Sequence, residues 1–355
     1  MARKHLLVVH GMGQHTDESV KAEVADAFTT AFSRYASLKD KKVADLMEIV
    51  PVSYAEIFDT FRQQRATSNE GLSEWLAGIN GMQSLPLQAV AEVNDLEASL
   101  AEDTFFNTHW LDVLLYRFTF LSERVRLKVA AAIGKSIVDA QGSTNVHVLG
   151  HSLGTAVLHD TLAKAYGPEN IELDGKAINL NSVSDRLAGI HMVANVSRAL
   201  QSFVAVGSSI VRPGPLGCAG VFAEYRHRLD PIPMIRQFNP TNNGEWVPQT
   251  IFTSVYSLRE PTSVTEANVH GLGHYLLTPE VHQLLFRLLF NFAPKKAEKA
   301  AGEAAYLATT VLGKAKALQA AFGDLGGAAS EESVTKLLKT AKALKDMVQG
   351  FGEQF

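Results

Sequence analysis

The chain has 355 residues, of which 46% are hydrophobic and 20% are charged. This composition supports a large buried core and is unlike that of a disordered chain. The formal net charge of −4 leaves no basic field for binding nucleic acid. Cys218 is the single cysteine, so no disulfide can form within the chain and nothing demands an oxidising compartment.

The first predicted element is a buried strand at Lys4–Val9, followed directly by His10-Gly11-Met12-Gly13. So early a strand leaves no room for a signal peptide, and no apolar stretch approaches 18 residues. We therefore expect a soluble, cytoplasmic protein without a transmembrane segment. The glycine turn has neither the third glycine of a dinucleotide-binding turn nor the lysine of a P-loop, which disfavours phosphate binding.

Apolar residues at helical spacing then predict a helix over Glu18–Arg34, and Leu46–Val52 is typical of a second core strand. Further helical patterns follow at Ile57–Arg65, Leu72–Ile79, Leu87–Ala101, Trp110–Phe120 and Leu121–Asp139. The last of these resembles a core helix. The earlier patterns predict an inserted helical cap at about residues 58–119. Its apolar residues would line a pocket or form ordinary helix cores, and both interpretations stay open: Met82, Leu85, Leu87, Val90, Phe105, Phe106, Trp110 and Tyr116.

The most informative motif is Gly150-His151-Ser152-Leu153-Gly154, which lies between a β-rich run at Val146–Leu149 and a helical pattern at Thr155–Leu162. A strand that turns into a helix through G-x-S-x-G is typical of a nucleophile elbow. The two glycines allow strand and helix to approach closely, which exposes the serine hydroxyl at the apex of the turn. The amide of Leu153 then lies at the helix N-terminus, where it can bind a developing oxyanion.

Together, the H-G-x-G turn after the first strand and this elbow resemble the lipases and esterases of the α/β-hydrolase superfamily. The resemblance implies an α/β fold with a mostly parallel central sheet flanked by helices. It also implies that Met12 supplies a second oxyanion donor beside Leu153, and that an acid and a histidine follow Ser152 along the chain.

The position of the acid follows from the strands after the elbow. Ser202–Ser208 resembles the next core strand, although Ser209 stands where many relatives have proline. Val221–Leu229 alternates like a strand and leads into Asp230, which resembles the acid position of the family. An aspartate before proline is also a common turn. Asp185 competes for the role, but it precedes the strand at Ser202 and suits an earlier loop.

Two histidines can complete the triad. After a last strand predicted at Gln249–Tyr256, one loop carries both His270 and His274. The resemblance favours His270, because Tyr275 follows it by five residues and a helix begins near Pro279. The other imidazole is then an ordinary hydrogen-bonded loop histidine.

The composition changes after Pro294, where residues 295–355 become rich in Ala, Lys, Gly and Glu and form two helical patterns. We therefore predict a hydrolase domain at 1–293 and a helical appendage at 294–355. The appendage either docks on the body or contacts a partner, a second copy of the chain or a membrane surface.

No metal or cofactor is implied: His147 and His151 lie on a strand and a turn, without the glutamate of an H-E-x-x-H motif. The sequence predicts a serine carboxylesterase or lipase that forms an acyl-enzyme on Ser152 and acts on a small-molecule or lipid ester. Phospholipase, thioesterase and acyltransferase activities remain open because the same triad serves them. A non-catalytic scaffold with a hydrolase-like fold is the alternative of another class.

Overall fold

The computed structural model describes residues 3–67, 112, 115, 116, 121–200, 209–238 and 254–314. Within these ranges it leaves out residues 12, 14, 169, 170, 174, 231, 235, 236 and 267. In the described part of the chain, the helices are all too short or too polar to cross a membrane.

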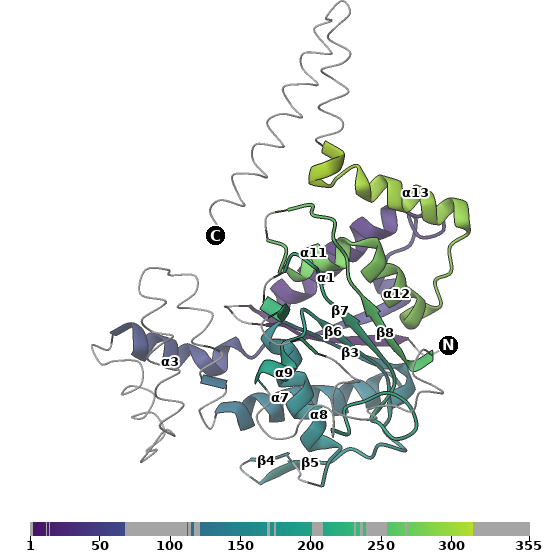
Figure 1. Ribbon diagram of the computed structural model, residues 1–355. Coiled ribbons are helices and arrows are strands. Elements are labelled where there is room, and N and C mark those ends of the chain that lie inside the picture. Colours follow the sequence, from purple (N-terminus) through teal and green to yellow (C-terminus); the bar gives the residue numbers. More distant parts are fainter. Residues whose placement is uncertain are drawn as a thin grey trace, which may run out of the picture.

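Six strands form the central sheet, in the order β2-β1-β3-β6-β7-β8 (Figure 1). They are β1 (Lys4–Val9), β2 (Met47–Val52), β3 (Val146–His151), β6 (Leu187–Val193), β7 (Ala219–Tyr225) and β8 (Tyr256–Arg259). All five pairings between these neighbours are parallel, so the carboxyl ends of the strands meet at one edge. This arrangement confirms the predicted α/β class with a parallel central sheet flanked by helices.

Helices cover both faces of the sheet, as a parallel sheet requires. One face carries α1 (Asp17–Ser33), α11 (Leu272–Leu277) and α12 (Pro279–Phe290), and the opposite face carries α7 (Leu121–Asp139) and α8 (Leu153–Ala165) (Figure 1). The smaller elements are α2 (Val43–Leu46), α3 (Ala55–Thr67), α9 (Ser197–Leu200), α13 (Lys296–Leu307), the β4–β5 hairpin (Ile171–Leu173 and Lys176–Ile178) and two 3₁₀ turns (Ser143–Asn145 and Ile232–Met234).

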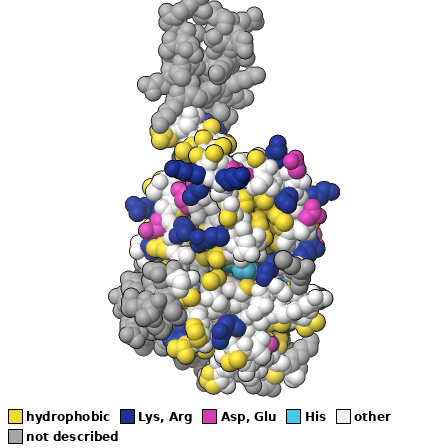
Figure 2. Space-filling view, turned by 90° about the vertical axis from the view of Figure 1, so that its right-hand side faces the viewer, with side chains coloured by type: hydrophobic (Ala, Val, Ile, Leu, Met, Phe, Trp, Pro, Cys, Tyr) yellow, Lys and Arg dark blue, Asp and Glu magenta, His cyan; other side chains and the backbone are white. Residues whose placement is uncertain are grey.

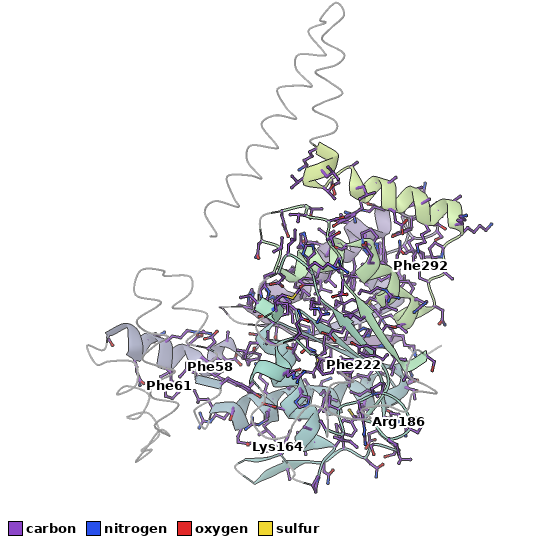
Figure 3. The ribbon with its side chains drawn as sticks, viewed as in Figure 1. Phe58, Phe61, Lys164, Arg186, Phe222 and Phe292 are labelled. Atoms are coloured by element: carbon purple, nitrogen blue, oxygen red, sulfur yellow. The ribbon has the colours of Figure 1, made fainter. Side chains whose placement is uncertain are left out.

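The core lies in two layers, one on each side of the sheet. Along β1, Leu7 and Val9 pack in the α7–α8 layer, whereas Leu6 and Val8 pack in the α1–α12 layer. This division follows from the alternation of side chains along a strand. Figure 3 labels aromatic residues of both layers, among them Phe222 on β7 in the α7–α8 layer and Phe292 just after α12 in the other.

Local sequence signals explain where the helices of the α1–α12 layer begin and end. Thr16 and Ser19 form a capping box at the start of α1, because each side chain accepts a hydrogen bond from the backbone N–H of the other residue. Helix α12 starts with Pro279 at its first position and ends at Asn291, which adopts a left-handed conformation with φ of 58°.

Several sequence predictions agree closely with these elements, whereas two predicted strands have other bounds in the structure and one strand was not predicted. The neighbour of β3 is β6, which the sequence analysis did not predict; the strand expected at Ser202–Ser208 lies outside the described residues. Strand β7 ends at Tyr225 rather than at Leu229. Strand β8 begins at Tyr256, where the predicted strand ended.

The predicted cap and appendage are described only in part. The cap boundary at residue 58 falls inside α3, and Phe58 and Tyr116 are both buried in the α7–α8 core layer. Tyr116 therefore fits the interpretation of an ordinary core residue, and the seven other candidate pocket residues lie outside the described part. In the appendage, α13 docks on the body through buried Tyr306, whereas residues 315–355 are outside the described part.

Basic and acidic side chains are interspersed on the face shown in Figure 2, with hydrophobic side chains gathered between them. That face therefore carries charges of both signs, in keeping with the small net charge of the chain.

Candidate active site

Ser152 lies at the sharp turn between β3 and α8, at the carboxyl edge of the sheet. Its φ of 54° and ψ of −128° are strained for a residue with a side chain. The turn is tight: a Cβ on Gly150 would lie 2.8 Å from the carbonyl oxygen of Gly154, and a Cβ on Gly154 would lie 2.2 Å from that of Val9. Only glycine fits at these two positions, as the motif predicts.

The backbone around Ser152 is fixed on both sides. Its N–H donates to the carbonyl of Val193 on β6 over 3.0 Å, and its carbonyl accepts from both the backbone N–H and the hydroxyl of Thr155. The serine occupies the N-cap position of α8, but its hydroxyl makes no capping bond and is turned to a histidine instead.

His270 connects Ser152 to Asp230. Its Nε2 lies 2.9 Å from Oγ of Ser152, and its Nδ1 lies 2.8 Å from Oδ2 of Asp230. Because a carboxylate can only accept, Nδ1 carries the proton and Nε2 of the neutral ring is left to accept from the serine hydroxyl. The side chain of His270 is 22% exposed, whereas that of Asp230 is fully buried.

The carboxylate of Asp230 is held by three groups. Besides His270, its Oδ1 accepts from the backbone N–H of Ile232 and its Oδ2 accepts from the hydroxyl of Tyr275 over 2.8 Å. The backbone N–H of Asp230 itself donates to the carbonyl of His227. In the sequence, Tyr275 only marks the histidine loop by its spacing, so this contact was not predicted.

The competing candidates lie elsewhere. His274 is buried in α11, where its Nε2 accepts from the backbone N–H of Thr265 and burial lowers its pKa to about 4. Asp185 accepts from the backbone N–H of Asn181 in the loop just before β6, so it lies at the amino edge of the sheet, opposite to Ser152.

Of the two expected oxyanion donors, Leu153 and Met12, the structure describes only Leu153. Leu153 is the first residue of α8 and is buried, which places its amide among the first-turn N–H groups of that helix. Met12 lies outside the described residues. Its neighbour Gly11 packs directly against Ser152, since a Cβ on Gly11 would lie 2.7 Å from Cβ of Ser152.

His151 contacts the loop that carries His270. His151 donates from Nε2 to the backbone carbonyl of His270 over 2.7 Å, and burial together with the imidazoles of His10 and His270 lowers its pKa well below the ordinary value. His151 is therefore neutral and holds the loop that carries His270. This role of His151 was not predicted from the sequence, where His151 was considered only as a metal ligand.

Glu23 on α1 contacts two segments that flank the candidate site. Its Oε1 accepts from the backbone N–H of Gly273 over 2.9 Å, and its Oε2 lies 3.5 Å from Nε2 of His10. One carboxylate therefore contacts both the loop after β1 and the first turn of α11, which follows the loop that carries His270.

In the part of the chain that the structure describes, no group of three or more His, Cys, Asp or Glu side chains is arranged to hold a metal ion. His147 instead hydrogen bonds to His191 on the adjacent strand over 3.1 Å, and burial lowers the pKa of His147 to about 3.

Comparison with known proteins adds no relative: no protein-family model, no curated protein and no solved structure matches the chain.

Proposed function

We propose that the chain is a serine ester hydrolase with an α/β-hydrolase fold, which cleaves carboxylic esters through an acyl-enzyme on Ser152. The observation that carries this proposal is the hydrogen-bonded series from Oγ of Ser152 through the imidazole of His270 to Asp230, with contacts of 2.9 and 2.8 Å. The three residues come from separate loops, and the parallel sheet brings those loops to one edge.

In the first half of the reaction, Oγ of Ser152 attacks the ester carbonyl carbon while Nε2 of His270 takes the hydroxyl proton. The carbonyl oxygen becomes an oxyanion, for which the amides of Leu153 and Met12 are the proposed donors. Asp230 stabilises the imidazolium that forms. The intermediate then breaks the bond to the leaving alcohol, which receives the proton from Nε2.

In the second half, water attacks the acyl-serine ester and His270 takes a proton from that water. Collapse of the second tetrahedral intermediate releases the carboxylic acid and returns the proton to Oγ of Ser152. If a second alcohol or thiol took the place of water, the same groups would perform acyl transfer.

The proposal also assigns the predicted cap and the C-terminal appendage to regions outside the catalytic centre. We take residues 1–293 as the hydrolase domain and about residues 58–119 as a cap whose apolar side chains favour a lipidic or acyl ester. A p-nitrophenyl ester series from acetate to palmitate tests the esterase activity and the preference for apolar acyl chains, with Ser152→Ala as the control. We expect turnover that depends on acyl length and is lost in Ser152→Ala. Wild-type protein that hydrolyses none of these esters would favour a non-catalytic scaffold.

A further inference from the structure

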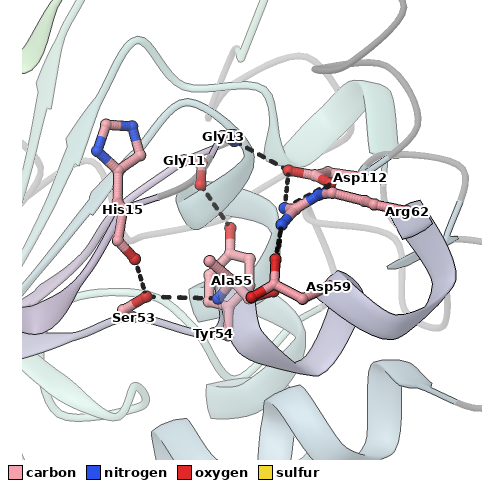
Figure 4. Close-up of polar contacts among 9 residues, drawn as sticks. All are labelled: Gly11, Gly13, His15, Ser53, Tyr54, Ala55, Asp59, Arg62 and Asp112. Carbon is pink, nitrogen blue, oxygen red and sulfur yellow. Dashed lines mark hydrogen bonds and ion pairs between the residues drawn. The ribbon is translucent and has the colours of Figure 1, made fainter. Parts of the chain in front are cut away.

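The loop after β1 is held at both of its glycines. The hydroxyl of Tyr54 donates to the carbonyl of Gly11 over 3.2 Å, and the backbone N–H of Gly13 donates to Oδ2 of Asp112 over 2.9 Å (Figure 4). Burial and the nearby Asp112 raise the pKa of Tyr54 well above its ordinary value, so its hydroxyl stays protonated and remains a donor. Both contacts come from side chains outside the triad.

Asp112 is itself clamped by Arg62 of α3. Nε of the guanidinium donates to Oδ1 over 2.8 Å, and a terminal nitrogen donates to Oδ2 over 2.8 Å. The side chain of Asp112 is 1% exposed and that of Arg62 is 8% exposed, so the bidentate pair is almost dry (Figure 4). Buried pairs of this kind contribute little net stability but fix geometry tightly.

These anchors act on the peptide groups that flank the proposed oxyanion donor. The carbonyl of Gly11 shares a planar peptide group with the amide of residue 12, so a hydrogen bond that orients the carbonyl also orients that plane. The N–H of Gly13 is committed to Asp112 and is therefore not left for substrate. Since Gly11 abuts Ser152, a small shift of this loop changes the space beside the nucleophile.

The stretch of chain that carries Asp112 also contacts α8, the helix that begins beside Ser152. Four residues on, the hydroxyl of Tyr116 donates to Oδ2 of Asp160 on α8 over 3.0 Å. Residues 112 and 116 thus connect to the loop after β1 and to the helix that begins beside Ser152.

We propose that Arg62 and Asp112 are positioning residues that set the oxyanion loop, residues 10–13, for catalysis, so that catalytic competence depends on the docking of Asp112 and Tyr116. This inference rests on the proposed ester hydrolase function. It identifies a role for α3 and for the end of the predicted cap that the triad alone does not supply.

The first test compares Asp112→Ala with Asp112→Asn. Loss of one oxyanion donor typically lowers kcat by roughly 100- to 1,000-fold, and a displaced donor costs less. We therefore expect Asp112→Ala to lower kcat for p-nitrophenyl butyrate about 10- to 100-fold with KM nearly unchanged. Asp112→Asn should recover most of the rate, because its side-chain oxygen still accepts from Gly13. Asp59→Ala is the matched control, since it removes the other carboxylate on Arg62 and leaves Gly13 untouched.

A neutral pair of variants separates loop positioning from the cost of a buried lone charge. Arg62→Gln with Asp112→Asn keeps an acceptor for the Gly13 N–H, whereas Arg62→Met with Asp112→Leu removes it. The inference requires kcat of the first double variant to be clearly higher than kcat of the second, at similar melting temperatures. Equal kcat in the two, or losses that only follow melting temperature, would overturn it.

Hydrogen exchange of the peptide that covers the oxyanion loop provides a readout that does not require activity. We expect faster exchange there in Asp112→Ala than in wild type and Asp59→Ala. Unchanged exchange together with unchanged kcat refutes the positioning role. If wild-type protein hydrolyses no ester but the exchange difference is present, the proposed function fails while the anchor itself stands.

Discussion

The hydroxyl of Tyr275 donates to Oδ2 of Asp230, the same oxygen atom that lies 2.8 Å from Nδ1 of His270. The phenolic oxygen in turn accepts from the backbone N–H of His227 over 2.9 Å. Because both contacts are buried, Tyr275 fixes the direction of the carboxylate toward the imidazole. An aromatic residue five positions after the histidine thus contacts the acid of the proposed triad directly.

Replacement Tyr275→Phe removes this hydroxyl and keeps the ring. A hydrogen bond to a charged group contributes about 1.5–3 kcal/mol, and each 1.4 kcal/mol corresponds to a tenfold change in rate. We expect kcat to fall roughly tenfold with little change in KM, measured on a short p-nitrophenyl ester. Phe222→Leu, a change in the opposite core layer, is a control for general loosening. If Tyr275→Phe retains full kcat, Asp230 needs no orientation by the phenol.

His270 and His274 should differ sharply when each is replaced by alanine. The imidazole of His270 contacts Ser152 and Asp230, whereas that of His274 is buried against the backbone of Thr265. We expect kcat to fall by several orders of magnitude in His270→Ala and far less in His274→Ala. His274→Ala should lower the melting temperature more than His270→Ala does, because His274 is the more buried residue. The reverse order of activities would assign the base to position 274.

Glu224 on β7 gives stability a dependence on pH. Burial raises its pKa from 4.5 to about 7, while Oε2 accepts from the hydroxyl of Tyr256. Between these values the folded state binds more protons than the unfolded chain, so the free energy of unfolding falls as the pH rises. This contribution is fully present below about pH 4.5 and is lost by about pH 7.

Urea unfolding of wild type and Glu224→Gln at pH 5, 6, 7 and 8 measures this contribution, because glutamine keeps the acceptor and removes the titration. We expect the difference in unfolding free energy, wild type minus variant, to decline as the pH rises. Taking the difference cancels other titrating groups, such as His274. A difference that is constant over this range would refute a raised pKa at Glu224.

The two parts of the appendage should contribute unequally to stability. Tyr306 of α13 is 1% exposed, and its hydroxyl bonds to Thr278 and to the carbonyl of Ser263. Replacing a buried aromatic residue by alanine typically costs about 3–5 kcal/mol, so Tyr306→Ala should lower the melting temperature markedly. We expect a chain that ends at Gly327 to fold, to hydrolyse short esters and to melt near the full-length value. Insoluble protein, or loss of turnover, would show that residues 328–355 complete the hydrolase body.

The sequence predicted those parts of the fold whose signal is local. The helix expected at Leu121–Asp139 has these bounds in the structure, and so does the strand at Lys4–Val9. Strand β6 was missed because Gly189 and His191 interrupt its apolar pattern. The predicted strand at Gln249–Tyr256 coincides with β8 only at Tyr256, because residues 254 and 255 are helical; residues 249–253 lie outside the described part.

For the site, chain order and glycine motifs indicated Ser152, Asp230 and His270, which the structure brings into hydrogen-bonding distance. The residues that hold their surroundings carried no comparable signal. Arg62 and Asp112 are 50 residues apart and pair only through the fold, so no spacing in the sequence connects them. His151 lies beside the nucleophile, but its contact with the His270 carbonyl spans 119 positions.

The most direct test of the proposed activity is labelling by a fluorophosphonate, which reacts with an activated serine nucleophile. Wild-type protein should gain the mass of one phosphonyl adduct, and peptide mass spectrometry should locate that adduct on Ser152. Ser152→Ala should stay unlabelled while keeping the melting temperature of wild type. Labelling of the variant at the wild-type rate, or a wild-type protein that neither labels nor hydrolyses any ester, would contradict a hydrolase that acts through Ser152.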